Sequence, residues 1–167
     1  SMYFSHGDAG RALALAERAI DSTGQLATAW ALRGHALLAA GDLDDALASF
    51  HRAIGLDPAL ADAQLAVADI YQRQNRPQRA LATLQTLADR FPARQVPTAV
   101  LFREGLALAA LGRPHDAIRA FRQAVEYGPG NADSLCALAQ AHFAVGESAA
   151  ARQELHLARA MEPAHAG

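Results

Sequence analysis

Hydrophobic and polar residues alternate with the period of amphipathic helices along nearly the whole chain. From residue 27 to residue 60, apolar side chains recur at i, i+3, i+4 and i+7, which places them on one face of a helix. This pattern is interrupted halfway at Gly41-Asp42, where one helix would end and the next begin. The segment therefore predicts two consecutive helices joined by a tight turn.

The same pair of helices is predicted three more times. Successive repeats start 34, 37 and 34 residues apart, and the longer one contains three additional residues, 95–97. Each repeat has a proline shortly before its end, at Pro58, Pro92, Pro129 and Pro163. Pro77 and Pro114 follow two of the midpoint breaks, where proline suits the first turn of a helix. The predicted repeats are 27–60, 61–97, 98–131 and 132–167. The further breaks are Asn75-Arg76, Gly112-Arg113 and Gly146-Glu147.

Aligning the repeats gives two columns of small residues and one column of large apolar residues. The small columns are Gly34, Ala68, Gly105 and Ala139, and then Ala46, Ala80, Ala117 and Ala151. The large column is Phe50, Leu84, Phe121 and Leu155. We expect the small columns to face each other so that paired helices approach closely, and the large column to fill the space between hairpins. We expect the carboxylates of Asp42, Asp44 and Asp45 to satisfy free N–H groups at a helix start.

The first repeat resembles the tetratricopeptide repeat (TPR), a 34-residue motif with set residue types at set offsets. It carries the motif at Trp30, Gly34, Leu37, Gly41, Ala46, Phe50, Ala53 and Pro58. Tyr71 keeps the motif's tyrosine in the second repeat, and Leu101 and Leu135 stand at its tryptophan position. The resemblance implies an all-α fold, a right-handed superhelical α-solenoid of antiparallel helix hairpins, with a concave groove that binds a peptide or helix of a partner protein.

The two ends of the sequence depart from complete repeats. Residues 1–26 match the second helix of a truncated preceding repeat, with Tyr3-Phe4 as the stub of its first helix. Repeat 132–167 lacks a polar capping helix of the kind that normally covers the last apolar face of such arrays. We interpret the chain as part of a longer array, or as one that self-associates into a homo-oligomer through uncapped ends.

The first helix of each repeat would line the groove, and its outward columns are the candidate binding residues. The N-terminal half of the groove is expected to be mainly polar and the C-terminal half to carry an apolar strip, a combination that suits a peptide or an amphipathic helix. The candidates are His35, Leu38, Leu65, Asp69, Gln72, Arg73, Phe102, Leu106, Gln140 and Phe143. The carboxylate clamp of some TPR proteins does not carry over, because of its positions here, Ala31, His35, Ala66, Ala99 and Arg103, only Arg103 has suitable chemistry.

The composition and charge of the chain exclude some classes of partner and location. The formal net charge is −2, which argues against nucleic acid as a ligand because phosphate binding needs concentrated positive charge. No apolar run approaches the ~20 residues of a membrane span, and no signal peptide is visible. These features favour a cytoplasmic protein, while a periplasmic location would require a signal or anchor outside this sequence. About a quarter of the residues are Ala and all 15 basic residues are Arg, which is typical of a high-GC bacterial source.

The sequence lacks the motifs of a catalytic or cofactor-binding site. Cys136 and His142 are six residues apart on one predicted helix, about 240° around its axis, so they would face different directions. Neither metal-ligand spacings nor a phosphate-binding glycine loop occurs, so we expect no metal, no cofactor and no enzymatic activity.

We therefore predict a non-catalytic protein-interaction scaffold. Three alternatives remain open: a regulatory or substrate-positioning arm of a larger bacterial enzyme or export assembly, a self-associating array, and RNA binding of the related pentatricopeptide type. The last is disfavoured because the groove columns are not basic.

Overall fold

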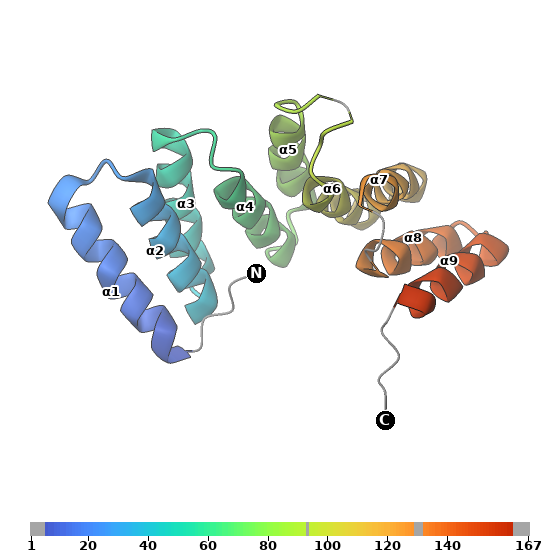
Figure 1. Ribbon diagram of the computed structural model, residues 1–167, viewed down its shortest axis with the longest axis horizontal. Coiled ribbons are helices and arrows are strands. Elements are labelled where there is room, and N and C mark those ends of the chain that lie inside the picture. The colour runs from blue at the N-terminus through green and yellow to red at the C-terminus, as the bar shows by residue number, and fades with distance from the viewer. Residues whose placement is uncertain (1–5, 93, 129–131, 162–167) are drawn as a thin grey trace. The chain divides into compact units, whose positions relative to one another are not determined.

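The computed structural model describes residues 6–92, 94–128 and 132–161, which form helices and connecting turns without any strand (Figure 1). The predicted Tyr3-Phe4 stub lies outside these residues. The helices are α1 His6–Thr23, α2 Ala27–Ala40, α3 Leu43–Leu56, α4 Ala61–Arg73, α5 Pro77–Ala88, α6 Thr98–Ala110, α7 Pro114–Tyr127, α8 Ala132–Ala144 and α9 Ser148–Met161.

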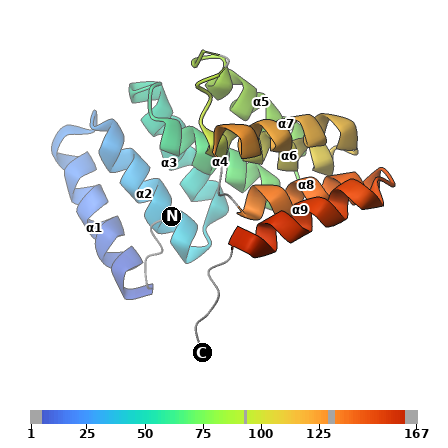
Figure 2. The same cartoon turned by 45° about the vertical axis from the view of Figure 1, so that its right-hand side comes forward.

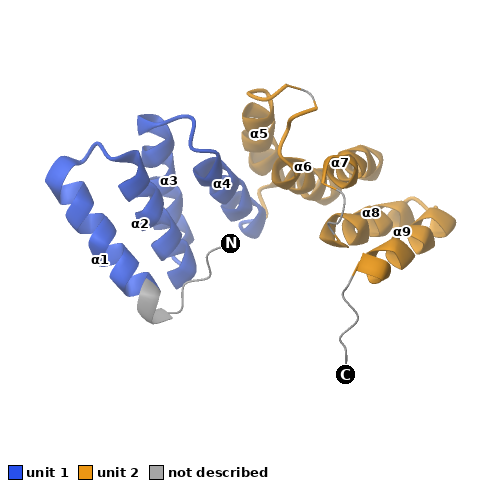
Figure 3. Ribbon diagram, in the orientation of Figure 1, with its two compact units in different colours: residues 1–74 blue, residues 75–167 orange. Residues whose placement is uncertain are grey.

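The helices belong to two compact units, residues 1–74 and 75–167 (Figure 3). In the first unit α1 packs against α2, α2 against α3, and α3 against α4. In the second unit each helix from α5 to α9 packs against its neighbour in sequence, and α6 also contacts α8. The boundary falls in the turn between α4 and α5, in the middle of the second predicted repeat.

The midpoint breaks predicted from the sequence are confirmed as sharp turns. Gly41 and Asn75 adopt left-handed backbone conformations with φ of 91° and 54°, and the other two breaks have a left-handed glycine in the same place. Pro77 and Pro114 are the first residues of α5 and α7, as expected. The capping prediction for Asp42 is wrong, because this residue precedes α3 without any side-chain hydrogen bond to the helix N-terminus.

The second small column is buried throughout, and the large column is buried in three of its four members. Ala46, Ala80, Ala117 and Ala151 are all buried, as are Phe50, Leu84 and Phe121. Leu155 on α9 contradicts the prediction for the large column, because 46% of its surface is exposed. Among the described residues no helix packs on this side of α9, so the leucine lacks the cover that its equivalents have.

The closest neighbour of Gly34 was not predicted from the sequence. The nearest atoms to a Cβ placed on Gly34 belong to the Phe50 ring, at 2.7 to 2.9 Å, rather than to Ala46. Gly105 lies even closer to the ring of Phe121. Phe50 and Phe121 thus contact the first helix of their own hairpin, and the glycines supply the space for the rings.

Polar contacts link the first three helices to one another. Glu17 Oε1 on α1 lies 3.8 Å from Arg33 Nε on α2, and Arg33 Nη1 donates a hydrogen bond of 2.6 Å to Ser49 Oγ on α3. The indole nitrogen of Trp30 donates to the Gly24 carbonyl at 3.0 Å, which ties α2 to the turn after α1. These contacts join α1 to the helix pair of α2 and α3.

Candidate functional site

Four of the predicted groove residues lie on α6 and α8, which contact each other in the second unit. Leu106 on α6 is 40% exposed, and Phe143 on α8 is 71% exposed. Gln140, one helical turn before Phe143, is exposed as well. An aromatic ring left this open makes almost no contribution to the core, so this surface, the α6–α8 face, has apolar side chains available for a partner.

Phe102 is shared between the α6–α8 face and the core. Its side chain is half-buried, and its ring centroid lies 5.9 Å from that of Phe121, with the planes tilted by 52°. Such aromatic pairs contribute about 0.5–1.5 kcal/mol beyond the area they bury. A charge at this position would therefore disturb the hairpin of α6 and α7 in addition to any binding surface.

The other six predicted residues lie on two helices of the first unit, which both pack against α3. His35 and Leu38 belong to α2 and are half-buried. The candidates on α4 are the half-buried Leu65, Asp69 and Gln72 and the exposed Arg73. This surface, the α2–α4 face, is mainly polar, whereas the α6–α8 face is mainly apolar.

His35 is held by its aromatic neighbour. The imidazole lies edge-on to Phe50, with ring centroids 4.9 Å apart and an interplanar angle of 77°. Burial lowers the pKa of His35 below 6.5, and the nearby charge of Asp62 opposes this only in part. The neutral ring therefore predominates near neutral pH and can offer one donor and one acceptor to a ligand.

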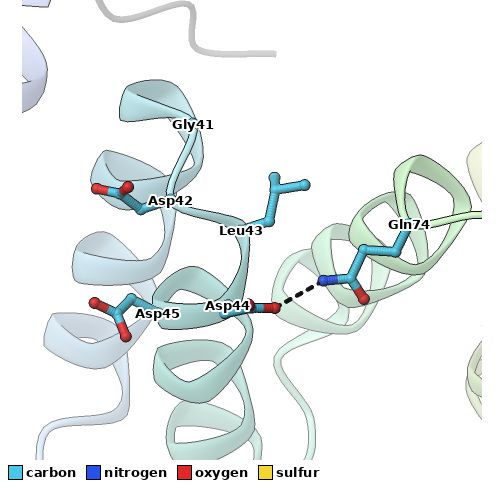
Figure 4. Close-up of a pocket in the computed structure, with 6 residues that line it drawn as sticks. All are labelled: Gly41, Asp42, Leu43, Asp44, Asp45 and Gln74. Carbon is cyan, nitrogen blue, oxygen red and sulfur yellow. Dashed lines mark hydrogen bonds between the residues drawn. The ribbon is translucent and has the colours of Figure 1, made fainter.

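A depression of about 490 Å³ opens beside the turn from α2 to α3 in the first unit (Figure 4). It is lined by residues 41–45 and Gln74, and the Gln74 Nε2 donates a hydrogen bond of 2.9 Å to Asp44 Oδ1. Three aspartates make its wall acidic, but the glutamine already occupies one of their carboxylates. We therefore interpret these residues as the loop at the start of α3, which a hydrogen bond from the end of α4 stabilises.

The sequence analysis missed a buried polar cluster between α8 and α9. His142 is buried, its Nδ1 lies 2.6 Å from Glu147 Oε2, and its Nε2 lies 3.3 Å from Glu154 Oε1. Burial raises the pKa of Glu154, while the charges of His142 and Arg122 act in the opposite direction. The available signal was a histidine in the column that holds Leu37, Tyr71 and Leu108 in the other repeats.

The cluster joins α8 to α9. The His142 Nε2 and the Glu154 Oε2 are buried without a hydrogen-bond partner. Cys136, which precedes His142 on α8, is a free and half-buried thiol. Across the described part of the chain, no group of three or more His, Cys, Asp or Glu side chains has an arrangement that could hold a metal ion.

Comparison with known families decides the identity of the repeat. One model described as tetratricopeptide repeat matches residues 37–97 and 108–166, and a second with the same description matches residues 2–61. The chain belongs to the tetratricopeptide repeat family. The TPR resemblance of the first repeat is thereby confirmed and extends over nearly the full sequence.

Solved TPR structures share the fold of this chain. The crystal structure of MamA matches with a TM-score of 0.82 at 19% identity, covering 93% of this chain and 90% of that one. MamA from Desulfovibrio magneticus RS-1 matches with a TM-score of 0.85 at 18% identity, covering 96% and 89%. YrrB, described as a TPR protein with an unusual peptide-binding site, matches with a TM-score of 0.75 at 23% identity, covering 95% and 80%.

The comparison with curated protein sequences gives no match. The all-α TPR fold is thus established by the family models and by the solved structures together. Within the residues that the structure describes, no helix combines the length and the apolar character that crossing a membrane requires.

Proposed function

We propose that this TPR protein is a non-catalytic interaction module that binds an apolar peptide or helix of a partner on its α6–α8 face. The observation that carries this proposal is Phe143, an aromatic side chain that is 71% exposed on a helix whose neighbour exposes Leu106. Aromatic anchors of this kind dominate the binding energy of protein interfaces. Membership of the TPR family and the fold shared with the peptide-binding YrrB support the same class of function.

The α6–α8 face is suited to a ligand with spaced apolar anchors. Leu106 and Phe143 are accessible, and Gln140 beside them supplies an amide that can donate and accept hydrogen bonds. An amphipathic helix presents apolar side chains at i, i+3 or i+4 and i+7, which fits such a surface.

The test begins with peptides selected by phage display against the full chain and measures their affinity by fluorescence anisotropy. Phe143→Glu and Leu106→Glu should each weaken binding at least tenfold, because each removes an anchor and introduces a charge facing apolar groups. Phe102 is left unchanged because its ring also packs on Phe121. Far-UV circular dichroism checks that the variants keep their helix content.

The matched control is Leu157→Glu on α9. Leu157 is 48% exposed, and its equivalents Arg52, Thr86 and Gln123 are exposed polar residues. This substitution should change affinity less than twofold. Selected peptides that bind all the variants with the same affinity would show that the α6–α8 face is not the binding surface.

A further inference from the structure

A stripe of three residues at i, i+3 and i+7 recurs in every second helix of the array, from α1 to α9. In the first four of these helices the stripe is entirely apolar. Its members are Leu13, Ala16 and Ile20, then Leu47, Phe50 and Ile54, then Leu81, Leu84 and Ala88, then Ile118, Phe121 and Val125. In α9 the equivalent residues are Arg152, Leu155 and Arg159. We call these three residues the α9 stripe.

Each apolar stripe belongs to a helix that packs against the helix following it in the chain. The packed pairs are α1 with α2, α3 with α4, α5 with α6, and α7 with α8. The central residues Ala16, Phe50, Leu84 and Phe121 are all buried, whereas Leu155, whose helix has no following helix packed on it among the described residues, is 46% exposed. This side of the second helix is therefore the surface on which the fold receives another helix.

The α9 stripe keeps the apolar centre of that surface and adds positive charge on both sides. Leu155 is 46% exposed, and Arg152 and Arg159 are both exposed. The arginines are seven residues apart, about 10.5 Å along the helix axis at 1.5 Å per residue. The Nε of Arg152 donates to the Ser148 carbonyl at 3.2 Å, so its terminal Nη groups remain available for a ligand.

Among the residues that the structure describes, no carboxylate pairs with an arginine of the α9 stripe. Glu154 is only 15% exposed at its side chain and points toward His142 on α8, as does Glu147 from the turn before α9. Both views of the molecule place α8 alongside α9 (Figure 1, Figure 2). The carboxylates of Glu147 and Glu154 therefore lie toward His142, and the arginines lie on a different side of α9.

We propose that the α9 stripe is a second interaction surface, which binds an acidic amphipathic helix of a partner protein. A helix is the occupant because the same side of the equivalent helices receives one. Carboxylates seven residues apart on the ligand would pair with Arg152 and Arg159, with a large apolar side chain between them against Leu155. This surface is distinct from the α6–α8 face, so the two proposals stand or fall separately.

Charge also argues against a second copy of this chain docking end to end on the α9 stripe. On α1 the exposed residues Arg11, Leu15 and Arg18 form a similar stripe, with Leu15 58% exposed. Bringing this side of α1 against the α9 stripe would place arginines opposite arginines, which is unfavourable. An acidic helix from another protein would instead place carboxylates opposite these arginines, which is favourable.

The experiment titrates the full chain into a fluorescein-labelled 18-residue helical peptide with a central leucine and glutamates seven residues apart. We expect saturable binding that is at least tenfold weaker for the double variant Arg152→Glu/Arg159→Glu. A peptide with glutamines in place of the glutamates should bind more weakly to the original chain. A peptide with lysines instead should prefer the double variant, and raising NaCl to about 0.5 M should weaken the glutamate peptide because salt screens exposed charges.

The matched control is Arg11→Glu/Arg18→Glu, which makes the same charge change at the same spacing on α1. This variant should keep the original affinity. Equal loss in both double variants, or equal binding of the glutamate and glutamine peptides, would overturn the proposal in favour of non-specific charge attraction. Sedimentation velocity adds the remaining outcome, since a dimer that disappears in Arg152→Glu/Arg159→Glu would assign the α9 stripe to a second copy instead.

Discussion

Gly34 and Phe50 provide the sharpest test of how the hairpins are held together. A Cβ at residue 34 would lie 2.7 Å from the Phe50 ring, whereas ordinary contacts of this kind begin at 3.4 Å. The ring would have to move by about 0.7 Å, in a side chain that is fully buried. Overpacking of this kind costs about 1–3 kcal/mol, and the better helix propensity of alanine returns about 0.5–1 kcal/mol. Gly34→Ala should therefore destabilise the first unit by about 1–2 kcal/mol.

The double variant Gly34→Ala/Phe50→Leu should recover most of this loss. Phe50→Leu alone removes part of a buried ring and costs about 1 kcal/mol through a cavity. In the double variant the smaller leucine leaves room for the new methyl group, so the two costs should not add. We expect a favourable coupling of about 1–2 kcal/mol, within the range measured for residues in contact. The second repeat has Ala68 and Leu84 in these same columns, which shows that the family accommodates this pair of sizes.

The assay follows the only tryptophan of the chain, Trp30, which lies on the same helix as Gly34. Its fluorescence during urea unfolding reports locally, which matters because repeat proteins need not unfold as one cooperative unit. The matched control is Gly10→Ala on α1, where no atom lies within 4 Å of the added Cβ. That control should be neutral or stabilising. Additive losses in the double variant, or a stable Gly34→Ala, would show that the ring does not pack on Gly34.

Two predictions concern pH. Burial, with a smaller contribution from Asp89, raises the pKa of Glu104 above its ordinary value of 4.5. The protonated side chain therefore stabilises the fold below pH 4.5, and this contribution is lost as the pH rises through the raised pKa. Glu104→Gln should therefore raise the urea midpoint of the second unit at pH 7, with no gain below about pH 4. Burial lowers the pKa of His35, so its contribution is complete above 6.5 and is lost as the pH falls through the lowered value. The urea midpoint followed by Trp30 fluorescence should fall less on acidification in His35→Leu than in the original chain. A variant whose midpoint falls just as far would show that His35 does not contribute to the pH dependence.

Features fixed by local chemistry were predictable from the sequence. The turn at Gly41 requires a left-handed backbone, and Pro77 suits the first turn of a helix, so both identify helix ends without knowledge of the fold. The column of Ala46 was predictable for a related reason, because a small residue repeated at one register indicates close packing wherever it occurs. The 34-residue period of the repeats predicted the helix pairs and indicated the TPR family.

Features that depend on which side chain meets which were not predictable in the same way. The close contact of the Phe50 ring with Gly34 was not predicted, because the direction in which a ring turns depends on the full packing. The contact between His142 and Glu154 joins residues on different helices whose types carry no shared pattern. The same limit applies to Phe102, whose column indicated a groove residue although its ring also packs on Phe121.

The comparison of columns between repeats also indicates where function should be sought. Positions that pack the hairpins keep their size and polarity from repeat to repeat because each change costs stability. The fourth repeat departs from the other three at Arg152 and Arg159, which stand in otherwise apolar columns, and it places an exposed aromatic ring at Phe143, in a column that already varies between Leu38, Gln72 and Ala109. None of these three side chains is buried, so none of them stabilises the core. Two separate sides of the hairpin of α8 and α9 therefore carry exposed residues that the core does not use, one apolar and one basic, and these are the two surfaces for which we propose partners.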